Sequence, residues 1–351
     1  MREAFMTDRP GVFEIRECDD APAPGPGEVQ IRVRATGICG SDLHGMRDPA
    51  RWNGGRRPGH EIAGEVVATG EGVHRWAVGD RAALQPNLFC GDCSTCLSGR
   101  IEICERGFTV IGLTLPGGYT ELLTVPQRNL HRMPNGMDFA LGAMTEPLAV
   151  VVHGYRMAAE ADSGRTTTGE RVVVLGGGII GLLAVFYARQ AGAGEVAVTA
   201  RYEQQANAAR QLGATHVFAA DEAGEDELRR WSQEHPVDLV IETVGGSGEV
   251  LPVAMDVSRR GGRILILGVF DGQAAMPMQQ IIGKGTRIIG SLMYGYAGQH
   301  ADYDLAIELE RRFSDVLGNL ITHRVPLEEI ERGFALAVDK SSGAIKVTVE
   351  P

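Results

Sequence analysis

Residues that could hold one metal ion lie close together between Gly37 and Glu61. Cys39 stands near the start of this stretch, and His60 and Glu61 stand at its end. A catalytic zinc ion takes three protein ligands from the Cys, His and Glu set and keeps a fourth position open for water or substrate. A thiolate, an imidazole and a carboxylate that converge on one point therefore predict a catalytic zinc site.

Four cysteines, Cys90, Cys93, Cys96 and Cys104, form a second cluster. Their spacings let the thiolates turn inward onto one tetrahedral ion, and a zinc ion held by four thiolates has no open position. In a reducing compartment, such a cluster indicates a metal rather than disulfides. We therefore expect a structural zinc, with an iron–sulfur cluster as the alternative because it also takes four cysteines. Cys18 is interpreted as a small apolar packing residue.

A glycine-rich turn lies between two apolar segments. Val172–Leu175 before the turn has the character of a buried strand, and Ile179–Ala191 after it that of a helix. In this context the G-x-G-x-x-G spacing predicts a dinucleotide-binding turn, because its glycines permit the tight turn, the approach of the pyrophosphate and close packing of helix on strand. The residues expected to bind the cofactor are Gly176, Gly178, Ile179, Ile180 and Gly181.

The end of the next predicted strand should select the cofactor. An acidic residue there binds the adenosine ribose hydroxyls of NAD. This chain instead has Ala200 followed by Arg201, a small residue and a cation that can accept a 2′-phosphate. The sequence therefore favours NADP(H), and NAD(H) stays possible because Arg201 could also be a solvated surface charge.

The elements that must position these residues fall into two kinds. Up to Glu146, short strands separated by glycine and proline are expected. Val29–Arg34 alternates apolar and polar residues, and Ile62–Val67 continues that pattern, which is typical of half-buried strands. We therefore expect a compact, largely antiparallel β domain.

From Arg171 to about Gly290, apolar runs alternate with helical stretches, which is typical of βαβ units and a buried parallel sheet. Its strands are expected at Val172–Leu175, Val196–Thr199, Val237–Glu242, Arg263–Gly268 and Arg287–Gly290. The tail after Ser291 does not continue this rhythm. Its two helices and final strand are expected at Ala301–Phe313, Leu327–Val338 and Ala344–Val349.

The totals exclude several classes of protein. With 351 residues, two domains are expected. The net charge of -11 argues against a nucleic-acid partner or an anionic membrane surface, since both attract clustered positive charge. No apolar run approaches the roughly 20 residues that span a bilayer, and the N-terminus lacks a signal-peptide core. We therefore expect a cytoplasmic protein that acts on a small molecule.

Together these motifs resemble those of the zinc-dependent medium-chain dehydrogenase/reductase family, also called the alcohol dehydrogenase family. Gly117-Gly118-Tyr119-Thr120-Glu121 and Glu146-Pro147-Leu148-Ala149-Val150 add to the resemblance, which covers essentially the whole chain. It implies an α/β fold, with a GroES-like, mainly-β catalytic domain at 1–148 and 291–351. A Rossmann coenzyme-binding domain with a doubly wound parallel sheet is implied at 149–290.

The Glu146 context is most similar to the sorbitol, butanediol and threonine dehydrogenase subgroup. That resemblance implies a catalytic zinc environment of Cys39, His60, Glu61 and Glu146. If both carboxylates bound directly, the site would be net negative, so we expect one to bind and the other to approach through water or by exchange.

The resemblance also gives roles to residues that follow Cys39. Ser41 matches the hydroxyl position of the family's proton relay, and His44 matches the histidine that passes the proton to solvent. A buried structural histidine is the alternative for His44. Asp42 is expected to orient its neighbours.

The implied reaction is hydride transfer between a nicotinamide cofactor and a secondary alcohol, polyol or amino alcohol and its ketone. The implied assembly is a homodimer or homotetramer that pairs around Arg287–Met293. One alternative is a zinc-independent quinone or enoyl reductase of the same superfamily, which would lack Cys39, His60 and the cysteine cluster. A non-catalytic zinc- or NADP-binding protein is the other, and it would need no open zinc site.

Overall fold

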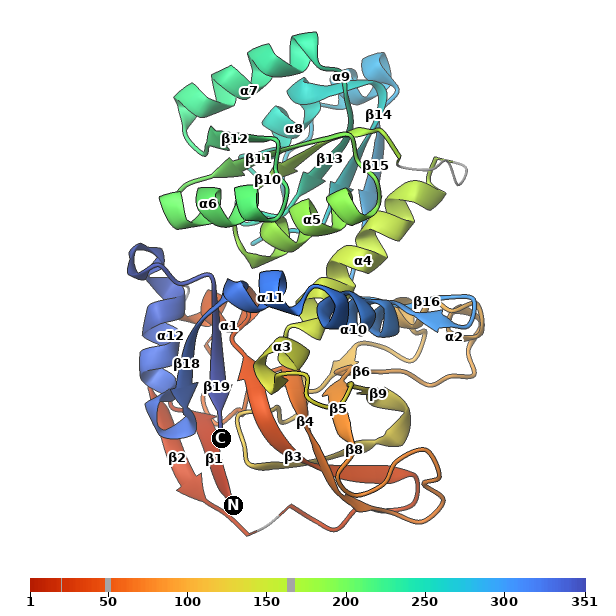
Figure 1. Ribbon diagram of the computed structural model, residues 1–351, viewed down its shortest axis with the longest axis vertical. Coiled ribbons are helices and arrows are strands. Elements are labelled where there is room, and N and C mark those ends of the chain that lie inside the picture. The colour runs from red at the N-terminus through yellow and green to blue at the C-terminus, as the bar shows by residue number, and fades with distance from the viewer. Residues whose placement is uncertain (20, 48–51, 163–167) are drawn as a thin grey trace. The chain divides into compact units, whose positions relative to one another are not determined.

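The computed structural model describes residues 1–19, 21–47, 52–162 and 168–351. The chain forms two compact units, which Figure 1 shows. The first unit combines Met1–Glu146 with Gly295–Pro351, and the second is Pro147–Tyr294. One unit is therefore built from both ends of the chain, and the other from its middle.

The first unit is organised around a seven-stranded sheet. Six strands follow the order β18-β19-β3-β4-β5-β9, and β8 also pairs with β3. All neighbours are antiparallel except β18 and β19, which run parallel. The strands are β3 (Glu28–Gly37), β4 (Glu61–Thr69), β5 (Arg81–Leu84), β8 (Leu122–Pro126), β9 (Leu130–Arg132), β18 (Ile321–Pro326) and β19 (Lys346–Glu350).

Apolar side chains on alternate positions of these strands form one core of the first unit. Val29, Ile31 and Val33 of β3 are buried together with Ile62 and Val66 of β4. This alternation is the predicted strand pattern, and it works because successive side chains of a strand point to opposite faces. The resulting core contains side chains of both β3 and β4.

A second core lies under the C-terminal helix of the first unit. Phe334 of α12 (Ile330–Val338) packs against Phe13 with ring centroids 4.7 Å apart, and against Tyr119 at 5.8 Å. The other elements of this unit are β1 (Arg2–Met6), β2 (Phe13–Glu17), α1 (Gly40–Arg47), β6 (Asn87–Leu88), α2 (Ser94–Leu97), β7 (Thr109–Val110), α3 (Phe139–Ala143), β16 (Tyr296–Ala297), β17 (His300–Ala301), α10 (Asp302–Arg312) and α11 (Ser314–Leu317).

The second unit is a six-stranded parallel sheet between helices. Its strand order is β12-β11-β10-β13-β14-β15. The strands β11 and β12 therefore lie on one side of β10, and the later strands β13, β14 and β15 lie on the other. Figure 1 shows α5 and α6 on one face of this sheet and α7 and α8 on the other. The elements are α4 (Thr145–Glu160), β10 (Arg171–Leu175), α5 (Ile179–Gln190), β11 (Glu195–Ala200), α6 (Glu203–Gln211), β12 (His216–Ala219), α7 (Glu222–Glu234), β13 (Val237–Glu242), α8 (Leu251–Val257), β14 (Ser258–Ile266), α9 (Met278–Lys284) and β15 (Arg287–Gly290).

All five predicted strands of this sheet are present, but β12 was not predicted. It is a short edge strand in which only Phe218 is buried, so its sequence lacks the apolar run of the inner strands. β14 begins at Ser258, earlier than predicted, because polar residues lead into its buried half. Among the described residues, no helix is long and apolar enough to cross a membrane.

Candidate active site

The end of β3 and the start of β4 bring three metal-binding side chains together. β3 ends at Gly37, which pairs with Glu61, the first residue of β4. Cys39 comes just after β3, and His60 comes just before β4. One ligand atom from each of Cys39, His60 and Glu61 lies within 4.8 Å of the other two. Strand pairing thus assembles the three predicted donors.

Two glycines permit this close approach. Gly59 has a φ of 97°, which side chains rarely adopt, and it turns the chain into His60. A Cβ at Gly37 would lie 1.9 Å from Oε2 of Glu61 and 2.9 Å from Cε of Lys346. The buried carboxylate therefore occupies space that only glycine at position 37 leaves free.

The electrostatics of these donors fit a zinc ion. His60 is 5% exposed and Glu61 is 1% exposed. Burial alone would lower the pKa of His60, but the charges of Cys39, Asp42 and Glu146 raise it well above its ordinary value. A buried imidazole among negative groups favours a bound cation, and the Cys, His and Glu donor set is the one that zinc prefers.

Glu146 approaches the same region from another element. It is the second residue of α4 and is 8% exposed. Its charge acts on His60, yet the group of mutually close donors among the described residues consists of Cys39, His60 and Glu61. The structure therefore brings all four predicted residues into one neighbourhood, with Glu146 outside the compact group.

Lys346 was not predicted from the sequence, and it forms a buried ion pair with Glu61. It is the first residue of β19, and its side chain is 1% exposed. Its Nζ contacts Oε2 of Glu61 and donates a hydrogen bond to the carbonyl of Ile38 at 3.1 Å. The sequence signal was a lysine within the predicted final strand Ala344–Val349, far from Glu61 in the chain.

Asp42 connects the metal donors to the surrounding core. Its Oδ2 accepts hydrogen bonds from the backbone N–H of Cys39 at 3.0 Å and from the hydroxyl of Tyr119 at 3.3 Å. Its Oδ1 lies 3.8 Å from Nδ1 of His60. Burial raises the pKa of Asp42, and the charge of His60 opposes that shift. Asp42 thus contacts two donors, which agrees with the orienting role expected for it.

The two predicted relay residues lie on α1. Ser41 and His44 are three residues apart, so they occupy neighbouring positions on one helix face. Oγ of Ser41 is buried and has no hydrogen-bond partner among the described residues. A buried hydroxyl in this state is available to a ligand that enters the site.

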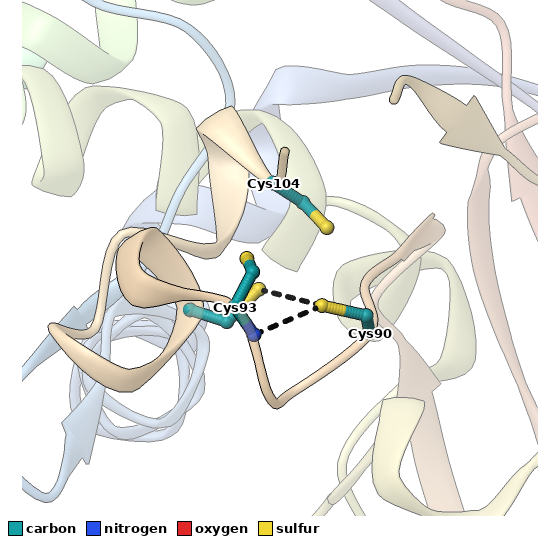
Figure 2. A group of neighbouring side chains, drawn as sticks. Cys90, Cys93 and Cys104 are labelled. Carbon is teal, nitrogen blue, oxygen red and sulfur yellow. Dashed lines mark hydrogen bonds between the residues drawn. The ribbon is translucent and has the colours of Figure 1, made fainter. Parts of the chain in front are cut away.

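The four remaining predicted donors form a cluster of their own, shown in Figure 2. The ligand atoms of Cys90, Cys93, Cys96 and Cys104 all lie within 4.8 Å of one another. Sγ of Cys90 is 3.8 Å from Sγ of Cys96, and it accepts a hydrogen bond from the backbone N–H of Cys93 at 3.3 Å.

A tetrahedron with zinc–sulfur bonds of about 2.3 Å has edges of about 3.8 Å. The geometry of the cluster therefore fits one tetrahedral ion. The hydroxyl of Thr95 and nearby backbone N–H groups lower the pKa of Cys93 to about 6, whereas burial raises the pKa of Cys96 to about 12. The cysteine cluster thus favours a thiolate at Cys93 without any metal. A bound cation would stabilise the other cysteines as thiolates.

The second unit carries the predicted dinucleotide-binding turn. Gly176 follows β10 with a φ of 108°, and Gly178 precedes the first residue of α5. A Cβ at Gly181 would lie 1.8 Å from the carbonyl oxygen of Gly176, so helix and turn pack as closely as the fingerprint requires. Ile179 and Ile180 form the first turn of α5.

The cofactor-selecting position lies beside this turn. Ala200 ends β11, and a Cβ at Gly177 would lie 3.2 Å from it. Arg201 follows with an exposed side chain, while its backbone N–H donates to the side chain of Gln205 at 3.2 Å. The structure therefore places Arg201 at the edge of the turn, with its guanidinium directed to the surface.

Comparison with known proteins gives the class of this chain. Residues 25–135 match the alcohol dehydrogenase GroES-like domain, and residues 180–311 match the zinc-binding dehydrogenase domain. The chain is 33% identical over 336 residues to 2-dehydro-3-deoxy-L-galactonate 5-dehydrogenase of Pseudoalteromonas atlantica, covering 94% of this chain and 93% of that protein.

Two solved structures are similar over the whole chain. A putative zinc-binding dehydrogenase from Sinorhizobium meliloti 1021, bound to NADP, has a TM-score of 0.82 with 29% identity and covers 100% of this chain and 99% of that chain. A short chain alcohol dehydrogenase from Escherichia coli CFT073, complexed with NADH, has a TM-score of 0.85 with 25% identity and the same coverage.

The chain belongs to the zinc-dependent medium-chain dehydrogenase/reductase family. It is an oxidoreductase of the alcohol and polyol dehydrogenase type that uses a nicotinamide cofactor and zinc. The predicted family, the fold with a GroES-like domain and a Rossmann domain, and the reaction class are confirmed.

Proposed function

We propose that the enzyme is an NADP(H)-preferring dehydrogenase that oxidises a secondary alcohol of a polyol, hydroxy acid or amino alcohol, or reduces the matching ketone. The grouping of Cys39, His60 and Glu61 within 4.8 Å carries this proposal. These donors fit an open zinc site, which a zinc-independent reductase or a non-catalytic binding protein has no need to build.

Cys39, His60 and Glu61 would hold the catalytic zinc, with Glu146 beside it. When bound, the ion supplies Lewis-acid polarisation of the substrate oxygen, which assists hydride exchange with the nicotinamide. Glu61 belongs to the group of donors whose ligand atoms lie within 4.8 Å of one another, and its carboxylate also contacts Lys346. We therefore assign direct binding to Glu61 and the approach through water or by exchange to Glu146.

Lys346 offsets the excess negative charge that two carboxylates would give the metal site. The thiolate and the two carboxylates contribute three negative charges, and Lys346 together with Zn²⁺ contributes three positive ones. The sum is zero. Lys346 thus offsets the charge of the second carboxylate, and the site keeps its ability to polarise an oxygen.

The residues of α1 would handle the alcohol proton. Ser41 has a buried hydroxyl that is free to accept a hydrogen bond from the substrate hydroxyl and to pass a proton on. His44, one helical turn away and half-buried, would exchange that proton with solvent. Asp42 between them holds the backbone of Cys39 in place rather than moving the proton.

The preference for NADP(H) rests on Ala200 and Arg201. No acidic side chain stands at the end of β11 to bind ribose hydroxyls, and Arg201 is exposed beside the glycine turn. An arginine here accommodates the 2′-phosphate of NADP. The two cofactor-bound relatives contain NADP in one case and NADH in the other, so the assignment depends on this chain's own residues.

The assembly and the second metal complete the proposal. The cysteine cluster would hold a structural zinc, which gives two zinc ions per chain. β15 is an edge strand that contains exposed Ile288, and exposed Leu292 follows it, so we propose that a second copy pairs there to form a dimer or a larger homo-oligomer. Because a cluster of four thiolates survives best under reducing conditions, we place the enzyme in the cytoplasm.

A substrate screen tests this function. Purified enzyme is mixed with polyols, sugar acids, amino alcohols and simple secondary alcohols, or with their ketones, and nicotinamide absorbance is followed with both cofactors. We expect turnover with at least one polyhydroxylated or amino-substituted secondary alcohol, and a higher kcat/KM with NADP than with NAD. Activity only on quinones or enoyl compounds, independent of zinc, would contradict the proposal.

A further inference from the structure

Glu310 is a buried carboxyl group that the reaction described above does not use. It lies on α10 and is 0% exposed. Its Oε2 accepts a hydrogen bond from Oγ1 of Thr145 at 2.6 Å, whereas its Oε1 has no partner among the described residues. Thr145 is also 0% exposed. Such a pair of polar side chains inside a core requires a physical explanation.

The pair does not add to stability in the usual way. Burial raises the pKa of Glu310 well above its ordinary value, and only the hydrogen bond from Thr145 opposes this shift. Its Oε1 meanwhile has no hydrogen-bond partner among the described residues. Replacing a buried polar pair by apolar residues of similar volume is often neutral or stabilising, so a fold alone would not need this pair.

The hydrogen bond from Thr145 is short and directional, and Thr145 is the first residue of α4. Glu310 therefore acts on the start of α4 through the geometry of this bond.

Thr145 directly precedes Glu146, the carboxylate that acts on His60. Because Thr145 is β-branched, its side chain has few rotamers, and a hydrogen bond to it also fixes the backbone at this position. The position of Glu146 in the first turn of α4 is therefore linked to the position of Glu310.

Glu310 is held in turn by a firmly anchored helix. Near the start of α10, the hydroxyl of Tyr303 donates to the carbonyl of Leu84 in β5 at 2.8 Å. Next to it, Asp304 contacts Nδ1 of His131 in β9 at 2.7 Å. These bonds fix α10 to the same sheet that carries the zinc donors of β3 and β4.

We propose that Glu310 is a positioning residue, which acts through Thr145 to hold Glu146 at its place beside the catalytic zinc site. The hydrogen bonds that join α10 to the sheet, together with the Glu310–Thr145 hydrogen bond, set the position of the Glu146 carboxylate. This inference rests on the proposed role of Glu146 in that site.

The test compares four variants with the native enzyme. In Thr145→Val/Glu310→Leu both polar partners are removed and the core volume is nearly kept. Glu310→Gln keeps a neutral hydrogen-bonding side chain, and Glu146→Gln removes the charge that is being positioned. Thr145→Val alone leaves the buried acid without its bond. Each is loaded with Co²⁺ at the catalytic site, and its visible absorption bands, kcat, KM and thermal midpoint are measured.

We expect the double variant to be at least as thermally stable as the native enzyme, with changed Co²⁺ absorption bands and kcat reduced by roughly tenfold or more, since small misplacements at an active site are costly. Glu310→Gln should keep native bands and most of the activity, and Glu146→Gln should alter the bands in the same direction as the double variant.

Native Co²⁺ bands and native kcat in the double variant would overturn the inference, and so would a loss confined to thermal stability. If Glu146→Gln also leaves the bands and kcat unchanged, the proposed role of Glu146 fails as well. If Glu146→Gln alters them and the double variant does not, only the role of Glu310 fails.

Discussion

Replacing Lys346 by methionine tests how the enzyme balances the charge of its site. The substitution keeps the length of the side chain and removes its positive charge. Glu61, 1% exposed, would then be buried beside Cys39 and His60 without its ion-pair partner. Removing one partner of a buried ion pair costs about 3–5 kcal/mol of stability, because the other charge stays buried without a partner.

We therefore expect Lys346→Met to lower the free energy of unfolding of the metal-free protein by about 3–5 kcal/mol. Denaturant titration, followed by a probe in the first unit, measures this difference. In Lys346→Met/Glu61→Gln neither charge remains, so much of the lost stability should return while turnover stays low.

The zinc-loaded enzyme gives the complementary result. If Lys346 offsets the second carboxylate, its loss leaves the site with an excess negative charge and a weaker pull on the substrate oxygen. We expect kcat of Lys346→Met to fall at least tenfold. Native stability together with native kcat would refute the charge balance described for Glu61, Glu146 and Lys346.

Three other predictions follow from the same geometry. Arg201→Ala should lower kcat/KM for NADP at least tenfold and leave the value for NAD nearly unchanged, and a native enzyme that already prefers NAD would contradict the cofactor assignment. Cys93→Ser should release one metal ion per chain and lower the thermal midpoint of unfolding, whereas an unaltered metal content would contradict the structural site. Because the pKa of Glu310 is raised in the folded protein, native stability should decline as pH rises above the ordinary glutamate value, by up to about 1.4 kcal/mol per pH unit, whereas Glu310→Gln should lack this contribution. The free energy of unfolding of Glu310→Gln minus that of the native enzyme should therefore rise from pH 5 to pH 8 in denaturant titrations. A difference that does not change with pH would refute the raised pKa.

Local patterns in the sequence predicted the donors that lie near one another in the chain. The four cysteines of the cluster are separated by a few residues, so their spacing alone indicates that they bind one ion. Val172–Leu175 followed by the glycine turn predicts a strand and a helix for the same reason. Cys39, His60 and Glu61 required one further step, because β3 and β4 had to pair before these residues could meet.

Contacts between distant segments could not be predicted in this way. Lys346 meets Glu61 only because β19 lies beside β3 in the sheet, and nothing near Lys346 in the sequence specifies that pairing. Glu310 on α10 appears in the sequence as one acidic residue among several, and its burial against Thr145 depends on how α10 packs. Both residues are buried charged or acidic groups, and their roles depend on tertiary structure rather than on local pattern.

The metal content of the native enzyme and of Cys39→Ser, measured together with turnover, tests the central claim most directly. Two zinc ions per chain are expected in the native enzyme, and one in the variant, because the cysteine cluster keeps its ion while the Cys39 site loses its thiolate. NADP-dependent turnover should disappear with the lost ion. An equal metal content in both proteins, or full turnover in Cys39→Ser, would contradict a catalytic zinc held by Cys39, His60 and Glu61.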